Sequence, residues 1–249
     1  MKNIKFLVHF GLASFFIFIL TGCNQQKNND LWPIIDPLPL SIDIESQIDE
    51  MLPKLTLEQK VGQVIQGDSD SVTPEEVKEY RLGSVLSGGN SAPGPLPYAE
   101  TKNWLEMADK YYNASIDNEG VEIAIPIIWG IDAVHGHANL KGAIIFPHNI
   151  GLGAMNNPDL IEQIAGVTAH ELTISGHDWT FAPTLAVPKD LRWGRSYEGF
   201  SEDPDIVQSY GGRIVIGLQG KFGSDDFMSD GKVISSAKHF LADGATQNG

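Results

Sequence analysis

Short apolar runs alternate with segments of helical spacing along most of the chain. Four runs have the length and composition of buried strands: residues 82–86, 125–131, 179–183 and 233–237. Each follows a segment in which apolar residues recur every three to four positions, and these helical segments start near residues 73, 101, 157 and 203. Helices that alternate with short apolar strands predict an α/β fold with a parallel sheet and helical crossovers.

Capping residues mark where several of these helices begin. Residues 56–59 and 73–76 both fit a capping box, and the second also has proline at the first helical position. The first box predicts a helix that continues through Gln66. An amphipathic helix is predicted before it, starting at Ser41 and stopping at Pro53.

Polar side chains follow three of the predicted strands. They are Asp132, His135 and His137 after the second strand, Arg192 and Arg195 after the third, and Lys238 and His239 after the fourth. In an α/β barrel every strand delivers its following loop to one face, whereas in a doubly wound sheet the loops meet only near a switch point. Three polar loops therefore favour a (β/α)8-type TIM barrel.

The body is too short for a complete barrel, which typically needs about 250 residues. Besides the four clear strands, only residues 144–146 and 191–193 suggest irregular ones, and the sequence ends in a loop-like stretch. We expect the N-terminal portion of a barrel over residues 41–249, belonging to a fragment of a longer protein.

The N-terminal segment predicts export and lipid attachment. Lys2 and Lys5 precede an apolar run over residues 6–20, which is shorter than the roughly 20 residues that span a bilayer. The run ends in LTGC, which resembles a bacterial lipobox with Cys23 as the lipidated residue; a buried structural cysteine is the alternative. We therefore expect a lipoprotein signal peptide over 1–22 and a tether over 23–40. The protein is expected in the bacterial cell envelope, anchored to a membrane on the periplasmic side or in the outer membrane.

Charge excludes one class of partner. The chain has 17 basic and 32 acidic side chains, for a net charge of −15, and no basic stripe follows the N-terminus. Nucleic-acid binding needs clustered Lys and Arg, so we expect no nucleic-acid partner. Hydrophobic residues make up 42% of the chain, which is enough for a packed core and argues against disorder.

Two of the strand-end loops offer alternative chemistry. Asp132 can accept two hydroxyl hydrogen bonds, as from a sugar, or can cap the next turn. Lys238 can bind a ligand or form a Schiff base with a carbonyl substrate, as in an aldolase-like lyase. His135 and His137 have a spacing found in metal sites, but without an evident third ligand we expect structural histidines. No metal site is predicted.

The loop of residues 190–204 is rich in charged and aromatic side chains. Arginine can form forked hydrogen bonds to neighbouring oxygens, and the loop can equally be held together by Arg–Glu pairs. We expect Arg192 and Glu198 to be structural and Arg195 to reach a ligand. The chain lacks a complete dinucleotide fingerprint, a Walker sequence and an HExxH motif, so no cofactor is expected.

Four motifs in order resemble the N-terminal barrel domain of glycoside hydrolase family 3. They are LTLEQKVGQ (55–63), GIDAVHGH (130–137), RWGRSYEGFSEDP (192–204) and AKHFLADG (237–244). The resemblance implies that Asp132, Arg195, Lys238 and His239 bind the hydroxyls of a terminal β-glucosyl unit. It also implies that Lys238 is a binding residue rather than a Schiff-base nucleophile.

The stretch after His239 lacks the additional histidine of the family's β-N-acetylhexosaminidases, so the chain is similar to the β-glucosidase and exo-β-glucan glucohydrolase branch. The implied substrate is a β-glucan or cello-oligosaccharide. In the family the nucleophilic Asp and the acid/base Glu come from later segments, so both are expected beyond Gly249 and this stretch alone is expected to be inactive. A non-catalytic glycan-binding surface lipoprotein remains the alternative.

Overall fold

The computed structural model describes residues 40–89 and 91–249. The chain divides into two units, residues 1–47 and 48–249, of which the second carries nearly all the described structure. The predicted signal peptide, Cys23 and the tether up to residue 39 lie outside the described residues.

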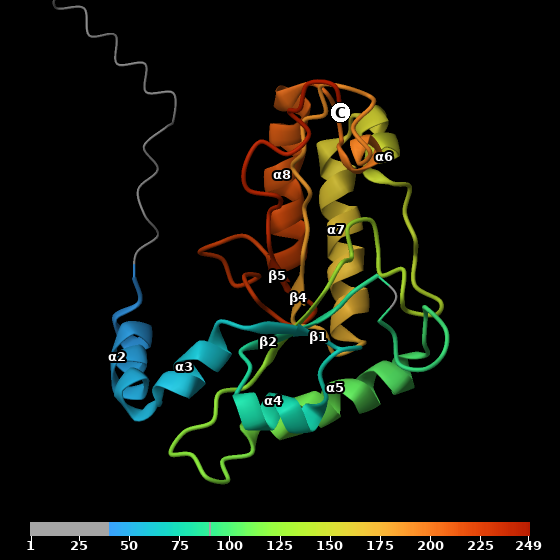
Figure 1. Ribbon diagram of the computed structural model, residues 1–249. Helices are drawn as coiled ribbons and strands as arrows, with labels where there is room; N and C mark the ends of the chain where they lie inside the picture. The colour runs from blue at the N-terminus through green and yellow to red at the C-terminus, as the bar shows by residue number, and fades with distance from the viewer. Residues whose placement is uncertain (1–39, 90) are drawn as a thin grey trace, which may run out of the picture. The chain divides into compact units, whose positions relative to one another are not determined.

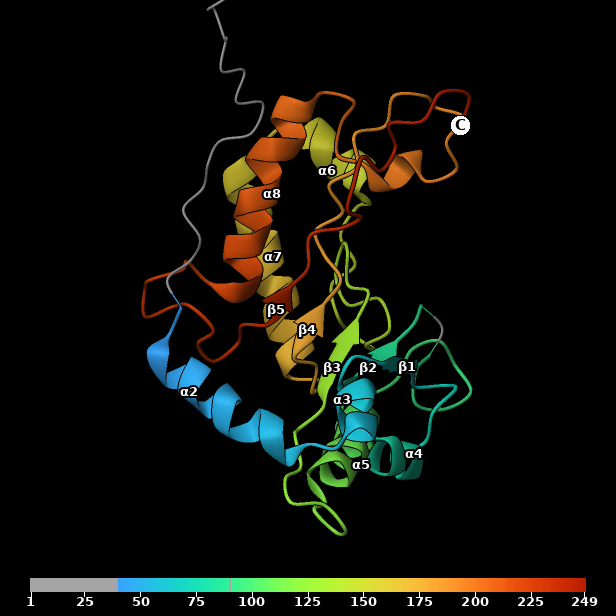
Figure 2. The same ribbon diagram turned by 60° about the vertical axis from the view of Figure 1, so that its left-hand side comes forward.

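Five parallel strands form the sheet of the second unit, and they follow each other in chain order (Figure 2). Their bounds are β1 Gln66–Asp68, β2 Ser84–Ser87, β3 Ile128–Ile131, β4 Trp179–Thr180 and β5 Ile234–Ser235. Each strand pairs in parallel with its successor, for example Leu86 opposite Gly130 and Ile131 opposite Thr180. This order is that of a TIM-type barrel, because a doubly wound sheet reverses its strand order at a switch point.

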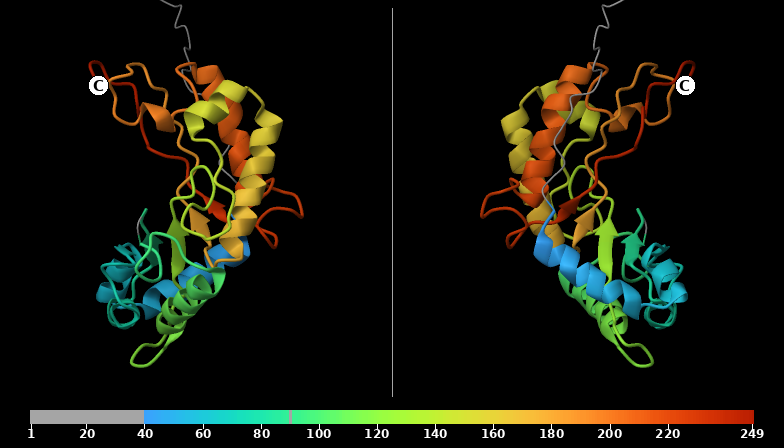
Figure 3. Two further views of the ribbon diagram at one scale, coloured as in Figure 1. Left: turned by 90° about the vertical axis from the view of Figure 1, so that its right-hand side faces the viewer. Right: turned by 90° about the vertical axis from the view of Figure 1, so that its left-hand side faces the viewer.

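Helices connect the successive strands, as parallel pairing requires, and two further helices, α2 and α3, precede β1. They are α2 Ile42–Met51, α3 Leu57–Gln63, α4 Pro74–Tyr80, α5 Thr101–Ile116, α6 Asn149–Met155, α7 Pro158–Thr173 and α8 Pro204–Gln219, with short 3-10 turns η1 Leu52–Lys54 and η2 Ser196–Glu198. In the second unit α7 and α8 run side by side, and α4 packs beside α5 (Figures 1 and 3). None of the helices within the described residues is both long enough and apolar enough to cross a bilayer.

The predicted helix starts are confirmed by their caps. The Thr56 hydroxyl accepts from the Gln59 amide at 3.2 Å, and the Gln59 side chain accepts from the Thr56 amide at 2.8 Å. The same reciprocal pair joins Thr73 and Glu76 at the start of α4. Asp203 caps α8 through the Asp205 amide at 2.9 Å. These local hydrogen bonds satisfy amides that have no partner inside the helix, so the sequence alone marks them.

Short elements were predicted less well. The expected helix through Gln66 ends at Gln63, and β1 follows it and pairs with β2. Residues 144–146 and 191–193 are not strands. The glycine-containing helix α6 was not predicted; Gly153 there lies so close to the Phe200 carbonyl that a Cβ would be 1.7 Å from its oxygen. Tertiary contacts rather than local preference define these segments.

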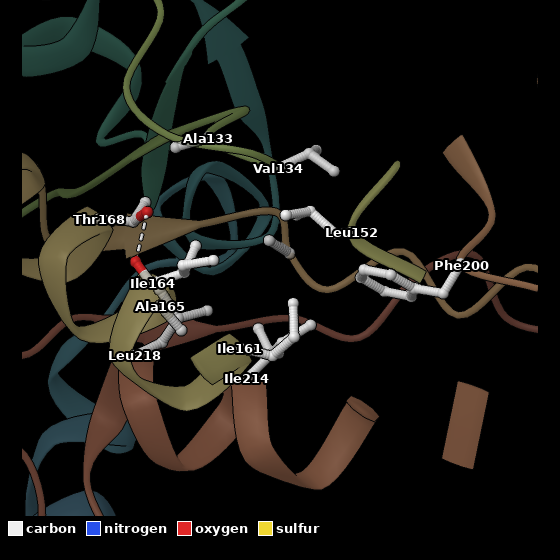
Figure 4. A pocket seen from close by; sticks show the side chains of 11 residues that line it. Ala133, Val134, Leu152, Ile161, Ile164, Ala165, Thr168, Phe200, Ile214 and Leu218 are labelled. Atoms are coloured by element: carbon white, nitrogen blue, oxygen red, sulfur yellow. Dashed lines mark hydrogen bonds between the residues drawn. The ribbon is translucent and has the colours of Figure 1, made fainter. Parts of the chain in front are cut away.

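A small apolar cavity lies in the core between α7, α8 and the segment after β3 (Figure 4). Its volume is about 20 Å³, and it is lined mainly by Leu, Ile, Ala and Phe side chains. The Thr168 hydroxyl donates its proton back to the Ile164 carbonyl at 3.0 Å. The cavity is a gap in core packing, because its volume is close to that of a single water position and far below that of a sugar ring.

An aromatic cluster around two buried histidines forms the other part of the core. Trp104 and Trp129 pack against the His177 ring at centroid distances of 4.9 and 4.8 Å. The Ser175 hydroxyl lies 3.1 Å from His137 Nε2 and 3.0 Å from His177 Nδ1. Burial lowers the pKa of His137 to about 4, and burial followed by the nearby His137 lowers the pKa of His177. The expectation that His137 is structural is confirmed.

The buried imidazole of His137 should make the fold sensitive to acid. In the unfolded chain His137 binds a proton below about pH 6.5, whereas in the folded chain it stays neutral down to about pH 4. Its contribution to the free energy of unfolding is therefore present above pH 6.5 and is lost as the pH falls towards 4, by about 3 kcal/mol in total. Urea unfolding followed by tryptophan fluorescence at pH 7.0 and 4.5 measures this loss.

The comparison that isolates this effect is His137→Gln, which should reduce the pH dependence of the unfolding free energy. His170→Gln removes an exposed histidine on α7 and should keep the wild-type pH dependence. If the unfolding free energy of His137→Gln falls between pH 7.0 and 4.5 by as much as that of the wild type, the role of this buried imidazole is refuted.

Candidate functional site

The residues that follow β3 and β5 meet at the carboxyl edge of the sheet. Asp132 comes directly after β3, and Lys238 lies three residues beyond β5, where it bridges to Thr184. The Lys238 ammonium donates to Asp132 Oδ1 in an ion pair between residues 106 positions apart. The side chains are 17% and 43% exposed, so the pair is reachable from solvent mainly on its Asp132 side. The predicted convergence of these two strand ends is confirmed.

Arg195 reaches the same edge from the loop after β4. Its guanidinium forms a fork with the Glu198 carboxylate, Nε to Oε1 and Nη2 to Oε2, both at 2.6 Å. The Arg195 guanidinium that donates to Glu198 lowers the pKa of this carboxyl. The buried Asn149 side chain donates to the Glu198 carbonyl at 2.8 Å, which attaches η2 to the start of α6. The Glu198 carboxylate therefore fixes the position of the Arg195 guanidinium, and Asn149 fixes the backbone of Glu198.

His239 lies next to Arg195. Its Nε2 is 3.3 Å from Arg195 Nη2, and its Nδ1 is 2.6 Å from Asp243 Oδ2. Of the four predicted binding residues, Asp132, Arg195 and Lys238 line one pocket of about 360 Å³. His239 and Lys238 line a neighbouring pocket of about 430 Å³, whose lining also includes residues 240–243 and Ala245. The structure thus brings all four close together, and Lys238 lines both pockets, whereas His239 lines only the second.

The loop after β3 forms one wall of the pocket. His135 Nδ1 lies 2.8 Å from the Phe146 carbonyl, which closes the loop on itself, as expected for a structural histidine. Gly136 makes this closure possible: its φ is +107°, and a Cβ there would be 2.2 Å from the Ile144 carbonyl oxygen. The fold thereby places Asp132 at the start of a loop that is closed by the contact of His135 with Phe146.

One aromatic side chain of the wall, His148, was not predicted from the sequence. The His148 ring lies 4.2 Å from that of His135 and 4.6 Å from that of Tyr197, measured between centroids. Burial, followed by the nearby His135, lowers the pKa of His148 and favours its neutral form. His148 also caps α6 by accepting from the Asn149 amide at 2.9 Å. No motif marks it, because its position in the wall depends on how the loop folds back.

The two residues of this loop that were expected to be structural, Arg192 and Glu198, have different partners. Arg192 forms an ion pair with Asp190 and also donates to Asn248. The Arg192 guanidinium lowers the pKa of Asp190 to about 2. Glu198 instead pairs with Arg195, so the Arg–Glu pair of this loop involves the arginine that was expected to reach a ligand. The structural residue Glu198 therefore acts directly on a predicted binding residue.

The charges of the pocket are balanced in pairs. Lys238 is paired with Asp132, and Arg195 with Glu198. The contact of the Lys238 amino group with the Asp132 carboxylate suits a binding role rather than attack on a carbonyl carbon. Among the described residues, no group of three or more His, Cys, Asp or Glu side chains could hold a metal ion. Forked donors and a carboxylate acceptor without excess charge suit a neutral ligand with several hydroxyl groups.

Comparisons with known proteins agree with this chemistry. The family model "Glycosyl hydrolase family 3 N terminal domain" matches residues 56–249. The crystal structure of an exo-1,3/1,4-beta-glucanase from a Pseudoalteromonas species is similar, with 47% sequence identity, a TM-score of 0.83, and coverage of 87% of this chain and 27% of that one.

Two relatives are named as β-glucosidases. The lysosomal beta glucosidase of Dictyostelium discoideum is 32% identical over 214 residues, which is 78% of this chain and 25% of that protein. The periplasmic beta-glucosidase of Salmonella typhimurium is 35% identical over 127 residues, which is 51% of this chain and 15% of that protein. The chain thus spans about a quarter or less of the length of these relatives. With its motifs, its barrel-type sheet and this family match, the chain belongs to glycoside hydrolase family 3 and carries the family's N-terminal domain.

Proposed function

We propose that this chain forms the glucosyl-binding part of an exo-acting β-glucosidase or β-glucanase. The observation that carries the proposal is the convergence of Asp132, Arg195 and Lys238 from three separate strand-end loops on one pocket. The 47% identity with an exo-1,3/1,4-beta-glucanase over 87% of the chain supports a β-glucan or cello-oligosaccharide as substrate.

Each of these side chains has a separate task with a sugar. The Asp132 carboxylate accepts hydrogen bonds from two neighbouring hydroxyls, while the Lys238 ammonium and Arg195 guanidinium donate to hydroxyl oxygens. His239 lies beside Arg195 and is the fourth predicted binding residue. Together they hold the ring of the terminal glucosyl unit in one orientation, which contributes to catalysis by positioning the anomeric carbon.

The proposed reaction is a retaining double displacement. A carboxylate attacks the anomeric carbon while a carboxylic acid protonates the leaving oxygen, and the same acid residue then activates the water that releases the sugar. We assign neither task to Asp132 or Glu198, because each carboxylate is already paired with a cation. The family resemblance assigns the nucleophilic Asp and the acid/base Glu to segments after Gly249.

We further propose that lipid on Cys23 attaches the protein to a membrane of the bacterial cell envelope. The support is the sequence of residues 1–23, with its two lysines, its short apolar run and the LTGC ending. A lipid-anchored exo-enzyme would meet soluble oligosaccharides at the membrane surface, and the polar segment after Cys23 would separate the barrel from the bilayer.

Substitution of Asp132 tests the binding role. In the full-length protein, Asp132→Ala should lower kcat/KM for cellobiose or laminaribiose by more than about 100-fold, because two hydrogen bonds to a charged acceptor are lost and Lys238 loses its partner. Initial rates of glucose release, with thermal melting to confirm folding, give the measurement. Asp117→Asn is the matched control. Asp117 forms an ion pair with Lys78 at 2.8 Å on the surface, and its substitution should leave the rate unchanged.

Other outcomes separate the alternatives. Near-wild-type kinetics of Asp132→Ala would contradict the proposed pocket. A wild-type protein that binds laminaribiose but releases no glucose would support the non-catalytic glycan-binding alternative. If the wild type hydrolyses an aryl β-xyloside much faster than the corresponding aryl β-glucoside, the terminal unit that it recognises is a pentose rather than glucose.

Lipid attachment has its own test. Cys23→Ala should move the protein from the membrane fraction to the soluble fraction of the envelope and abolish incorporation of labelled palmitate, because the thiol is the acceptor of the lipid. Gln26→Ala in the tether is the control and should remain membrane-bound and labelled. Continued labelling of Cys23→Ala would refute the proposed anchor.

A further inference from the structure

We infer that Glu198 and Asp243 are positioning residues that fix the two side chains between them, Arg195 and His239, in the state that binds sugar. The four form a continuous row, carboxylate–guanidinium–imidazole–carboxylate, from two loops. The inference rests on the proposed function for its consequence, although the protonation of the row can be measured without a substrate.

The contact between Arg195 and His239 determines which nitrogen of His239 carries the proton. A guanidinium only donates hydrogen bonds, so the His239 Nε2 that faces Arg195 Nη2 at 3.3 Å must accept. The proton of the neutral ring then sits on Nδ1 and is donated to Asp243 Oδ2 at 2.6 Å. Asp243 therefore stabilises the Nδ1–H tautomer and keeps a lone pair on Nε2.

Glu198 fixes the orientation of the Arg195 guanidinium. The fork engages Nε and Nη2 on one side of the guanidinium, so Nη1 is left for other acceptors. Glu198 is only 9% exposed, and its backbone is attached to Asn149. A carboxylate that is itself fixed in this way holds the arginine in a single rotamer better than a mobile surface partner does.

Asp243 is also fixed by the fold. Its carbonyl accepts from the Val187 amide at 3.2 Å, and the carbonyl of Gly244 accepts from the Lys189 amide at 3.1 Å. These bonds attach the segment after His239 to the segment after β4, which also leads into the Arg195 loop. The spacing of the two outer carboxylates is thus set by backbone contacts.

The two carboxylates act on a shared contact. Without Asp243 the Nε2–H tautomer of His239 becomes accessible, and its proton would face the Nη2 protons of Arg195. Two donors repel each other at this distance, so Arg195 would lose its orientation even with Glu198 in place. With both carboxylates present, the pocket offers the Asp132 carboxylate as an acceptor and Lys238 and Arg195 as donors, a set that matches hydroxyl groups that both give and receive hydrogen bonds.

The tautomer is tested by ¹⁵N NMR of the histidine-labelled full-length protein, with the His239 signals assigned from the His239→Gln spectrum. We expect a protonated Nδ1 and an unprotonated Nε2 in the wild type, and a mixture or reversal in Asp243→Ala. The same variant and Glu198→Gln should each lower kcat/KM for cellobiose by about 10- to 100-fold, the usual effect of removing one hydrogen bond to a charged group. Glu198→Gln keeps an amide oxygen for Arg195 Nε and should retain more activity than Glu198→Ala.

Glu162→Gln is the matched control. Glu162 pairs with Arg213 at 2.8 Å on the helices α7 and α8, so this variant removes an Arg–Glu pair of the same kind outside the pocket and should keep both the wild-type rate and the His239 signals. An Asp243→Ala protein with an unchanged ¹⁵N pattern and unchanged kcat/KM would overturn the inference. If the wild type releases no glucose, the proposed function fails, and the ¹⁵N pattern alone still decides whether Asp243 sets the tautomer.

Discussion

Parallel hydrogen bonding between each strand and its successor is the constraint on which the candidate site depends. Because β1 to β5 all run in the same direction and follow chain order, the loops after β3, β4 and β5 leave the sheet at one edge. Asp132, Arg195 and Lys238 are far apart in the chain, and only this geometry makes them neighbours. The strands themselves are short, and buried apolar residues of both the helices and the strand and loop segments hold the edge in place.

Charge pairing is the second principle of the pocket. Each cation that faces the pocket has a carboxylate partner, and the partners differ in burial: Asp132 faces the solvent, whereas Glu198 is nearly enclosed. A nearly enclosed carboxylate that is paired and hydrogen-bonded stabilises the orientation of its partner, while an accessible one can exchange its contacts for those of a ligand. This difference separates residues suited to contact a sugar from residues suited to support those contacts.

The same distinction explains how far the sequence could predict the site. Asp132, Arg195, Lys238 and His239 stand in motifs at strand ends, so both the periodicity of the chain and its family resemblance indicated them. Asp243 stands in the fourth motif, but its role could not be found in that way, and no motif marks His148, since both roles depend on which atoms these side chains face after folding. The sequence also could not assign partners to Arg192 and Arg195, because Asp190 and Glu198 both lie close to them along the chain and only the shape of the loop decides between them.

The sequence by itself determined the α/β alternation, the capped starts of α3, α4 and α8, and the identity of the chemistry-bearing loops. These features depend on hydrogen bonds and apolar patterns among residues a few positions apart, which a linear pattern records. Only the tertiary structure decided the existence of β1 and α6, the absence of strands at 144–146 and 191–193, and the row from Glu198 to Asp243. Those depend on pairing and close approach between segments distant in the chain, such as Gly153 against Phe200, and no local preference encodes them.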